Sequence, residues 1–402
     1  MSAEIVVDLA AIRHNVKALA AAIGTPVMTV VKADGYGHGM VEVARAAREA
    51  GAPWLGVATL AEAVELRDAG DTGRLLCWLS VPSDDFAPVL ERDVDVSAYD
   101  IAMLDRIAEA AARTGTVPRI HLKVDTGLSR GGSMPVDWRE LFEHTLAGQQ
   151  AGLWTFVGIF SHFASSEEPD NPANESQERV FREALALLDE VGLVPEVRHI
   201  ANSAAALMRP SARFDLVRCG IASYGLDPTP DLGPDRHHRV DLWPAMTVAG
   251  ELAMVKHVPA GAAVSYGGHW VAQCDTILGL VPAGYGDGIP RAAADRAQVQ
   301  VAGVRRPLRG SVCMDQFVVE LGPTEEGLHA GEPVVLMGPG HDGEPTAQDW
   351  AEATGTIHYE IVTRLGGRLV RRYRDSHAES QAEAPTEPSG QSGQSGESTG
   401  GI

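Results

Sequence analysis

A lysine at the end of an apolar segment is the feature of this sequence that most directly suggests catalysis. Residues 27–31 form an apolar run typical of a buried strand, and Lys32, one of only four lysines in the chain, follows it directly. Three glycines, Tyr36 and His38 come next, which is a loop composition. An amine in a partly desolvated site has a lowered pKa and can form Schiff bases. A lysine that reaches solvent from a strand edge fits this segment equally well, so the segment alone leaves both interpretations open.

Polar and ionisable residues also follow four later apolar segments. They are Lys123 to Arg130, Ser161 to Phe163, His199 to Ser203, and Arg218 to Ile221. Loops are commonly polar, so one such segment means little, but four in succession favour a functional site. The last two segments, with Ser203 and with Gly220 and Ile221, come where barrels commonly bind phosphate through backbone N–H groups.

The first part of the chain alternates between strand-like and helix-like patterns. Asp8 caps a helical pattern that Gly24 ends, and Thr59 with Glu62 forms a capping box before another. Eight apolar, strand-like runs lie at residues 27–31, 54–58, 75–79, 94–98, 120–124, 156–160, 197–200 and 216–219. Eight β–α units favour an α/β fold with a TIM-type (β/α)8 barrel over residues 1–234, although doubly wound sheets alternate in the same way.

The pattern changes after about residue 235. Strand-like runs at 246–258, 276–281, 299–304 and 317–321 alternate with glycine and proline turns, and one helix begins after Thr346. We therefore expect a mostly β domain over residues 235–373. The opening strand, residues 4–7, suits either domain. Residues 374–402 are rich in Ser, Gly, Gln, Glu and Pro, which predicts a disordered tail.

Composition and charge narrow the function classes. The net charge of −21 argues against nucleic acid as a partner. We find no secretory leader and no apolar run of about 18 residues, so we expect no membrane span and a cytoplasmic protein. The four cysteines lack the paired spacing of metal ligands, which predicts reduced thiols and no metal site.

These segments together resemble the alanine racemase family, and the resemblance extends to about Tyr373. The motifs that carry it in the second half are residues 264–267, 284–288, 313–316 and 358–360, which include Tyr266, Tyr285, Cys313-Met314-Asp315 and Tyr359. The match is not complete. Asp34-Gly35 stands where many relatives have Asn-Ala, and Leu128-Ser129 precedes Arg130 where Met-Gly or Met-Asn is common.

The resemblance implies pyridoxal 5'-phosphate (PLP) as the cofactor and a role for each motif residue. Lys32 would hold PLP as an aldimine, Arg218 would face the pyridine nitrogen with His162 behind it, and Arg130 and Met314 would bind the substrate carboxylate. The residues implied at the cofactor phosphate are Tyr36, Ser203, Gly220, Ile221 and Tyr359. Lys123 resembles a position that is carbamylated in some relatives; an ordinary lysine paired with Asp125 suits the sequence equally well.

The chemistry that the resemblance implies is racemisation of alanine, which supplies D-alanine for peptidoglycan. Removing a proton from one face of the α-carbon and returning one to the other is best done by two bases, and these would be Lys32 and Tyr266. In this family the tyrosine comes from the partner chain, so we expect a homodimer with composite sites. A PLP carrier without turnover and an amino-acid decarboxylase are the two alternatives that we keep.

Overall fold

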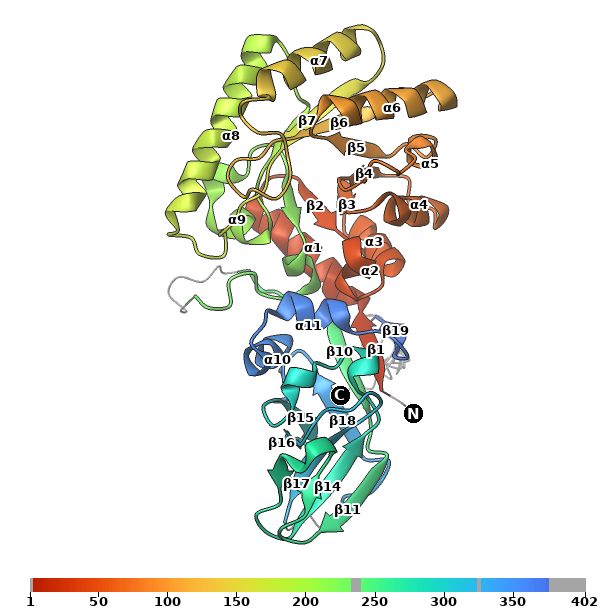
Figure 1. The fold of residues 1–402 in the computed structure, drawn as a ribbon, viewed down its shortest axis with the longest axis vertical. Helices are drawn as coiled ribbons and strands as arrows, with labels where there is room; N and C mark the ends of the chain where they lie inside the picture. Colours follow the sequence, from red (N-terminus) through yellow and green to blue (C-terminus); the bar gives the residue numbers. More distant parts are fainter. Residues whose placement is uncertain (1–2, 233–239, 324–326, 376–402) are drawn as a thin grey trace, which may run out of the picture.

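The chain forms two lobes, an upper α/β barrel and a lower, mostly β domain (Figure 1). The computed structural model describes residues 3–232, 240–323 and 327–375. The predicted tail therefore lies outside the described residues, except that Arg374 still belongs to the last strand. Among the described residues, no helix combines the length and apolar character that crossing a membrane requires.

The upper lobe is the predicted barrel. Eight parallel strands follow one another in the order β8-β7-β6-β5-β4-β3-β2-β9. They are β2 (Val27–Val30), β3 (Trp54–Val57), β4 (Arg74–Cys77), β5 (Asp95–Ala98), β6 (Arg119–Lys123), β7 (Thr155–Phe160), β8 (Val197–His199) and β9 (Val217–Cys219). Hydrogen bonds from Asp215 N to Arg198 O (3.1 Å) and from Arg218 N to Ala201 O (3.0 Å) join the two ends of the order. The (β/α)8 prediction is confirmed.

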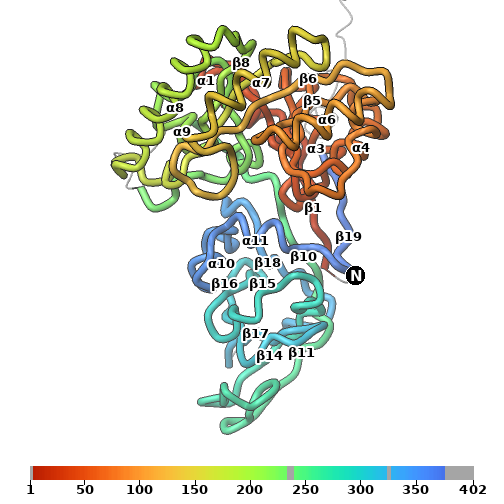
Figure 2. Tube along the Cα trace, turned by 45° about the horizontal axis from the view of Figure 1, so that its top comes forward, coloured from red at the N-terminus to blue at the C-terminus, as the bar shows by residue number. Residues whose placement is uncertain are grey.

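Helices surround these strands, as Figure 2 shows for α6, α7 and α8. They are α1 (Leu9–Ile23), α3 (Met40–Glu49), α4 (Leu60–Asp68), α5 (Ala87–Leu90), α6 (Ile101–Thr114), α7 (Trp138–Gln150), α8 (Pro172–Val191) and α9 (Ser203–Met208). The predicted caps are present. Asp8 accepts hydrogen bonds at the start of α1, Gly24 ends that helix in a left-handed conformation (φ 69°), and Thr59 with Glu62 forms the capping box of α4.

The lower lobe is built on a nine-stranded sheet in the order β11-β14-β17-β16-β15-β18-β10-β1-β19. Its strands are β1 (Glu4–Asp8), β10 (Met246–Glu251), β11 (Met254–Val258), β14 (Thr276–Val281), β15 (Gln298–Val301), β16 (Val304–Arg309), β17 (Phe317–Gly322), β18 (Pro333–Met337) and β19 (Val370–Arg374). A short hairpin, β12 (Ala263–Val264) and β13 (Trp270–Val271), and two helices, α10 (Ala347–Thr354) and α11 (His358–Arg364), complete it.

Three sequence-based predictions in this lobe need correction. The run 246–258 is two strands, β10 and β11, which pair with different neighbours. The run 299–304 is the hairpin of β15 and β16, because Ala302 and Gly303 turn with positive φ angles of 50° and 74°. Helix α11 and strand β18 were not predicted. The opening strand β1 pairs with β10 and β19, so the chain begins in the lower sheet and then enters the barrel (Figure 1).

Candidate active site

The carboxyl ends of the barrel strands surround a cavity of about 370 Å³. It is lined by Val30, Lys32, Ala33, Tyr36, Trp78, Lys123, Arg130, Phe160, His162, Asn202, Ser203, Arg218, Gly220, Ile221, Tyr359 and Thr363. All of the predicted site residues line it except Tyr266 and Met314. Residues from seven separate stretches of the barrel, and from α11 of the lower lobe, therefore meet at one point.

Lys32 begins a left-handed turn, α2 (Lys32–Tyr36), in which φ lies between 52° and 59° at Ala33, Asp34, Gly35 and Tyr36. The Glu62 carboxylate of the neighbouring α4 accepts the Ala33 N–H at 2.7 Å and so ties this turn to the next β–α unit. Burial lowers the pKa of Lys32, the positive charge of Arg130 lowers it further, and Glu62 opposes the change. The amine is thus more readily neutral and nucleophilic than a lysine in water.

Arg218 lies beneath the cavity and is held by its two terminal nitrogens. Nη1 donates to His199 Nδ1 (2.9 Å) and to the His199 carbonyl (3.1 Å). Nη2 donates to His162 Nδ1 (3.1 Å) and to the carbonyls of Ser161 (2.7 Å) and Ile200 (3.1 Å). Among the described residues, nothing accepts a hydrogen bond from its Nε–H. Burial lowers the pKa of Arg218 to about 10, so the guanidinium stays charged at neutral pH.

A tyrosine-lined corner closes the cavity beside Gly220. The Tyr36 ring lies 4.9 Å from Tyr224 and 6.3 Å from Tyr359, measured between ring centroids. A Cβ on Gly220 would lie 2.2 Å from the Tyr36 hydroxyl, so only glycine allows this approach. Ser203 Oγ accepts the Gly220 N–H at 3.0 Å. The following 3-10 turn, η2 (Ile221–Tyr224), adds N–H groups at its start that have no partner within the turn.

Lys123 and Arg130 form the opposite, basic wall. Burial lowers the pKa of Lys123 to about 8, and the charges of Arg130 and Arg218 add to the effect, while Asp125 opposes it. The Asp125 carboxylate accepts hydrogen bonds from the backbone N–H groups of Gly127 (2.8 Å) and Ser129 (3.2 Å). These hydrogen bonds stabilise the loop that carries Arg130.

Tyr266 and Met314 lie together on the lower lobe. The Ser265 hydroxyl donates to Ser311 O at 2.7 Å, and the Ser311 hydroxyl donates to Tyr266 O at 3.0 Å. Tyr285 N donates to Cys313 O at 3.0 Å. Tyr266 is 74% exposed and Met314 is 55% exposed. The fold thus gathers Tyr266, Tyr285 and Met314 into one exposed group that takes no part in lining this chain's own cavity.

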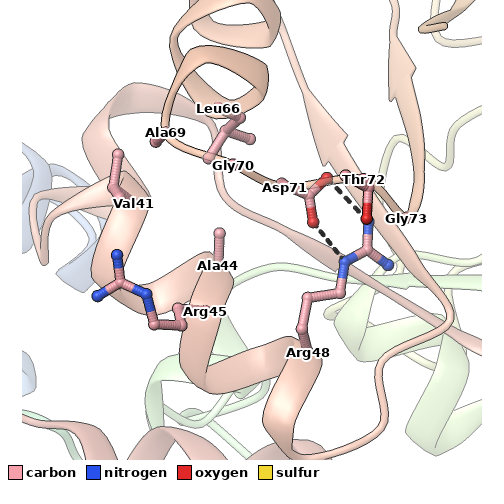
Figure 3. A pocket seen from close by; sticks show the side chains of 10 residues that line it. All are labelled: Val41, Ala44, Arg45, Arg48, Leu66, Ala69, Gly70, Asp71, Thr72 and Gly73. Carbon is pink, nitrogen blue, oxygen red and sulfur yellow. Dashed lines mark hydrogen bonds and ion pairs between the residues drawn. The ribbon is translucent and has the colours of Figure 1, made fainter.

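A second hollow of about 390 Å³ lies between α3 and α4 (Figure 3). Its inner guanidinium, Arg48, is already bound by both oxygens of Asp71, at 2.7 and 3.2 Å. Arg45 at its rim pairs with Glu42. This hollow offers no free charge for a ligand, unlike the barrel cavity. In the described ranges, no three His, Cys, Asp or Glu side chains are grouped as metal ligands would be.

Two family models match this chain, one over each lobe. Residues 7–228 match the family model of the alanine racemase N-terminal domain, and residues 245–373 match that of the C-terminal domain. This chain belongs to the alanine racemase family. It is 51% identical to the alanine racemase of Thermobifida fusca over 92% of this chain and 98% of that protein.

Solved structures of the alanine racemase family have the same fold. The alanine racemase of D-cycloserine-producing Streptomyces lavendulae superposes with a TM-score of 0.90 at 50% identity, covering 93% of this chain and 97% of that one. The enzyme from Streptomyces coelicolor A3(2) gives 0.89 at 48% identity, covering 92% and 98%.

The alanine racemase resemblance did not point to every residue of the cavity. Trp78 and Phe160 line it and were not predicted, and Asn202, within the predicted segment His199 to Ser203, was given no role. Trp78 and Phe160 lie at or just after the ends of barrel strands, so the strand-end rule applied evenly along the chain would have included them. Thr363 lies on α11, for which the sequence carried no signal.

Proposed function

We propose that this chain is a PLP-dependent alanine racemase that interconverts L-alanine and D-alanine and so supplies D-alanine for peptidoglycan. The observation that carries the proposal is the barrel cavity, in which a half-buried lysine of lowered pKa faces two arginines and a tyrosine-lined corner, in a chain of this family. The cytoplasmic location and the domain boundaries remain predictions from the sequence.

The cavity suits PLP in three respects. Lys32 offers a nucleophilic amine, and Arg218 offers its Nε–H toward a ring nitrogen. The corner beside Gly220 offers the Tyr36 hydroxyl and the N–H groups at the start of η2 to a phosphate. When bound, PLP supplies an electron sink that lowers the cost of removing the substrate α-proton. We therefore assign Lys32, Tyr36, His162, Ser203, Arg218, Gly220, Ile221 and Tyr359 to the cofactor.

The chain's own residues would then move the proton. The Lys32 amine exchanges a proton on one face of the substrate α-carbon, and Tyr266 exchanges one on the opposite face. Arg130 and the Met314 backbone N–H hold the substrate carboxylate. Arg218 is permanently charged and donates a hydrogen bond without giving up its proton. A cofactor ring held by this donor would withdraw electrons only moderately, which would favour return of a proton to the α-carbon over transamination.

Two copies of the chain would complete each site. Tyr266 and Met314 are exposed on the lower lobe and absent from this chain's cavity wall in the described residues. A head-to-tail homodimer would place that group over the partner's barrel, which would bring both bases to one substrate.

The direct test is a chiral assay of the purified chain with PLP and L-alanine, run in deuterated water. We expect D-alanine that carries deuterium at the α-carbon. Lys32→Ala should abolish the reaction, and borohydride reduction of the native chain should leave the pyridoxyl group on the peptide containing Lys32. Release of carbon dioxide would indicate a decarboxylase instead, and PLP binding without either reaction would indicate a carrier.

A further inference from the structure

A hydrogen-bonded line runs through the barrel interior away from the cavity. It starts at Arg218 on β9, whose Nη1 lies 2.9 Å from His199 Nδ1 on β8. His199 Nε2 lies 3.3 Å from His121 Nδ1 on β6, and His121 Nε2 lies 3.2 Å from Asp95 Oδ2 on β5. Asp95, His121 and His199 are completely buried. The line thus connects the floor of the cavity to the opposite end of the barrel, where β5 begins.

The strand between the two histidines leaves room for their contact. Strand β7 separates β6 from β8 in the sheet, and Gly158 stands on it beside His121. A Cβ at this position would lie 2.4 Å from His121 Nδ1. Any larger residue would occupy the space through which His121 reaches His199.

The two ends of the line determine where every proton sits. A guanidinium only donates hydrogen bonds, and a carboxylate only accepts them. Asp95 therefore accepts a hydrogen bond from His121 Nε2–H, and His121 Nδ1 is left to accept a hydrogen bond from His199. His199 must then donate from Nε2, and its Nδ1 becomes the acceptor that Arg218 requires.

The electrostatics agree with a neutral His199 ring beside the charged Arg218. Burial lowers the pKa of His199 well below its usual range, and the charge of Arg218 lowers it further. Burial alone would raise the pKa of Asp95, but the hydrogen bond from His121 and the charges of Arg119 and Arg74 outweigh it and bring that pKa below its ordinary value.

We propose that Asp95 is a positioning residue for the reaction, because it keeps the proton of His121 on Nε2 and so leaves His199 in the one tautomer that accepts from Arg218. Without Asp95, His121 is free to carry its proton on Nδ1 and donate to His199 Nε2. His199 Nδ1 would then bear a hydrogen and face the Nη1–H of Arg218. Two donors would meet, so this hydrogen bond would be lost. Arg218 would lose an acceptor and turn within the cavity floor. The expected effect on catalysis rests on the proposed function, whereas the expected tautomer of His199 does not.

The test compares Asp95→Asn and His121→Phe with the native holoenzyme. His121→Phe leaves the contacts of Asp95 with Arg74 and Arg119 in place. It also removes the ring that could donate to His199 Nε2, so Arg218 alone sets the His199 tautomer in this variant. Val96→Ala on the same strand is the control, because it removes buried methyl groups without touching the line.

The first readout is the tautomer of His199, from its ring ¹⁵N signals in histidine-labelled protein, assigned with a His199→Gln variant. We expect His199 Nε2 to be protonated in the native chain, in Val96→Ala and in His121→Phe, and a loss of that state in Asp95→Asn. In the native chain we also expect His121 to carry its proton on Nε2, a measurement that needs no variant. A native His121 proton on Nδ1, or an unchanged His199 tautomer in a folded Asp95→Asn chain, would overturn the proposal, whether or not the chain racemises alanine.

The second readout is the ratio of racemisation to transamination, from D-alanine against accumulated pyruvate and pyridoxamine phosphate. We expect this ratio to fall by about two- to tenfold in Asp95→Asn, the factor expected from one net hydrogen bond, and to stay unchanged in Val96→Ala and His121→Phe. A tautomer that changes while the ratio does not would overturn the link to Arg218. Absence of racemisation in the native chain would instead count against the proposed function.

Discussion

Arg371 and Asp34 form an ion pair, 2.8 Å between Nη1 and Oδ2, that joins the last strand of the lower sheet to the turn after Lys32. Arg371 Nε also donates to Gly37 O at 2.8 Å. The turn is left-handed, a conformation that costs about 1–2 kcal/mol for each residue other than glycine. The lower lobe therefore contributes to the shape of the loop that carries the candidate cofactor lysine.

Replacing Arg371 should weaken cofactor binding. In Arg371→Ala, both contacts to the turn are lost, and we expect the dissociation constant for PLP to rise by about two- to tenfold, as for one or two net hydrogen bonds. Equilibrium titration followed by PLP absorbance measures this change. Arg372→Ala is the matched control, because Arg372 lies on the same strand but pairs with Glu4 at 2.6 Å. Equal PLP affinity in the two variants would contradict this role of Arg371.

Gly37→Ala should be more destabilising than Gly24→Ala. Both glycines have positive φ, 79° and 69°, so each alanine pays the conformational cost of about 1 kcal/mol. Only the Cβ at position 37 meets backbone, the Val362 carbonyl oxygen at 2.2 Å, whereas nothing lies within 4 Å at position 24. We expect a loss of about 1 kcal/mol in the free energy of unfolding for Gly24→Ala and about 2–4 kcal/mol for Gly37→Ala. Urea unfolding measures both, and equal losses would show that α11 moves aside without cost.

Lys123 should take up carbon dioxide in a pH-dependent manner. Its pKa of about 8 means that the neutral amine, the form that reacts, predominates above pH 8 and declines as the pH falls below it. Native mass spectrometry in bicarbonate should show the added mass of one carbon dioxide, more at pH 8.5 than at pH 6.5 (values chosen about the pKa). Lys123→Arg should not show it. Absence of the added mass at both pH values would indicate an ordinary, unmodified lysine.

Mixed dimers should recover activity that neither parent has. Lys32→Ala and Tyr266→Phe homodimers each lack one base at both sites. After dissociation and random pairing, half the dimers are mixed, and each of these has one site with both bases intact. Recovery should therefore approach about one quarter of native activity. Inactive mixed dimers, verified by differential tagging, would place both bases on one chain and exclude composite sites.

The sequence by itself determined the α/β alternation and most of the cavity. Apolar strands that alternate with capped helices bury their faces in layers of parallel sheet and helix. Whether that sheet is open or closed, residues at the carboxyl ends of its strands share one side. This is why Lys32, Arg130, His162, Ser203 and Arg218 could be assigned to one site from their positions along the chain.

Only the tertiary structure decided what the linear order does not encode. The hairpin within residues 299–304 depends on two residues with positive φ, which local composition did not reveal. The pairing of β1 with β19, and of Arg371 with Asp34, joins residues more than 300 positions apart. The line from Arg218 to Asp95 depends on which side chains point into the barrel and on the gap at Gly158. Such contacts depend on three-dimensional packing, and local periodicity carries no information about them.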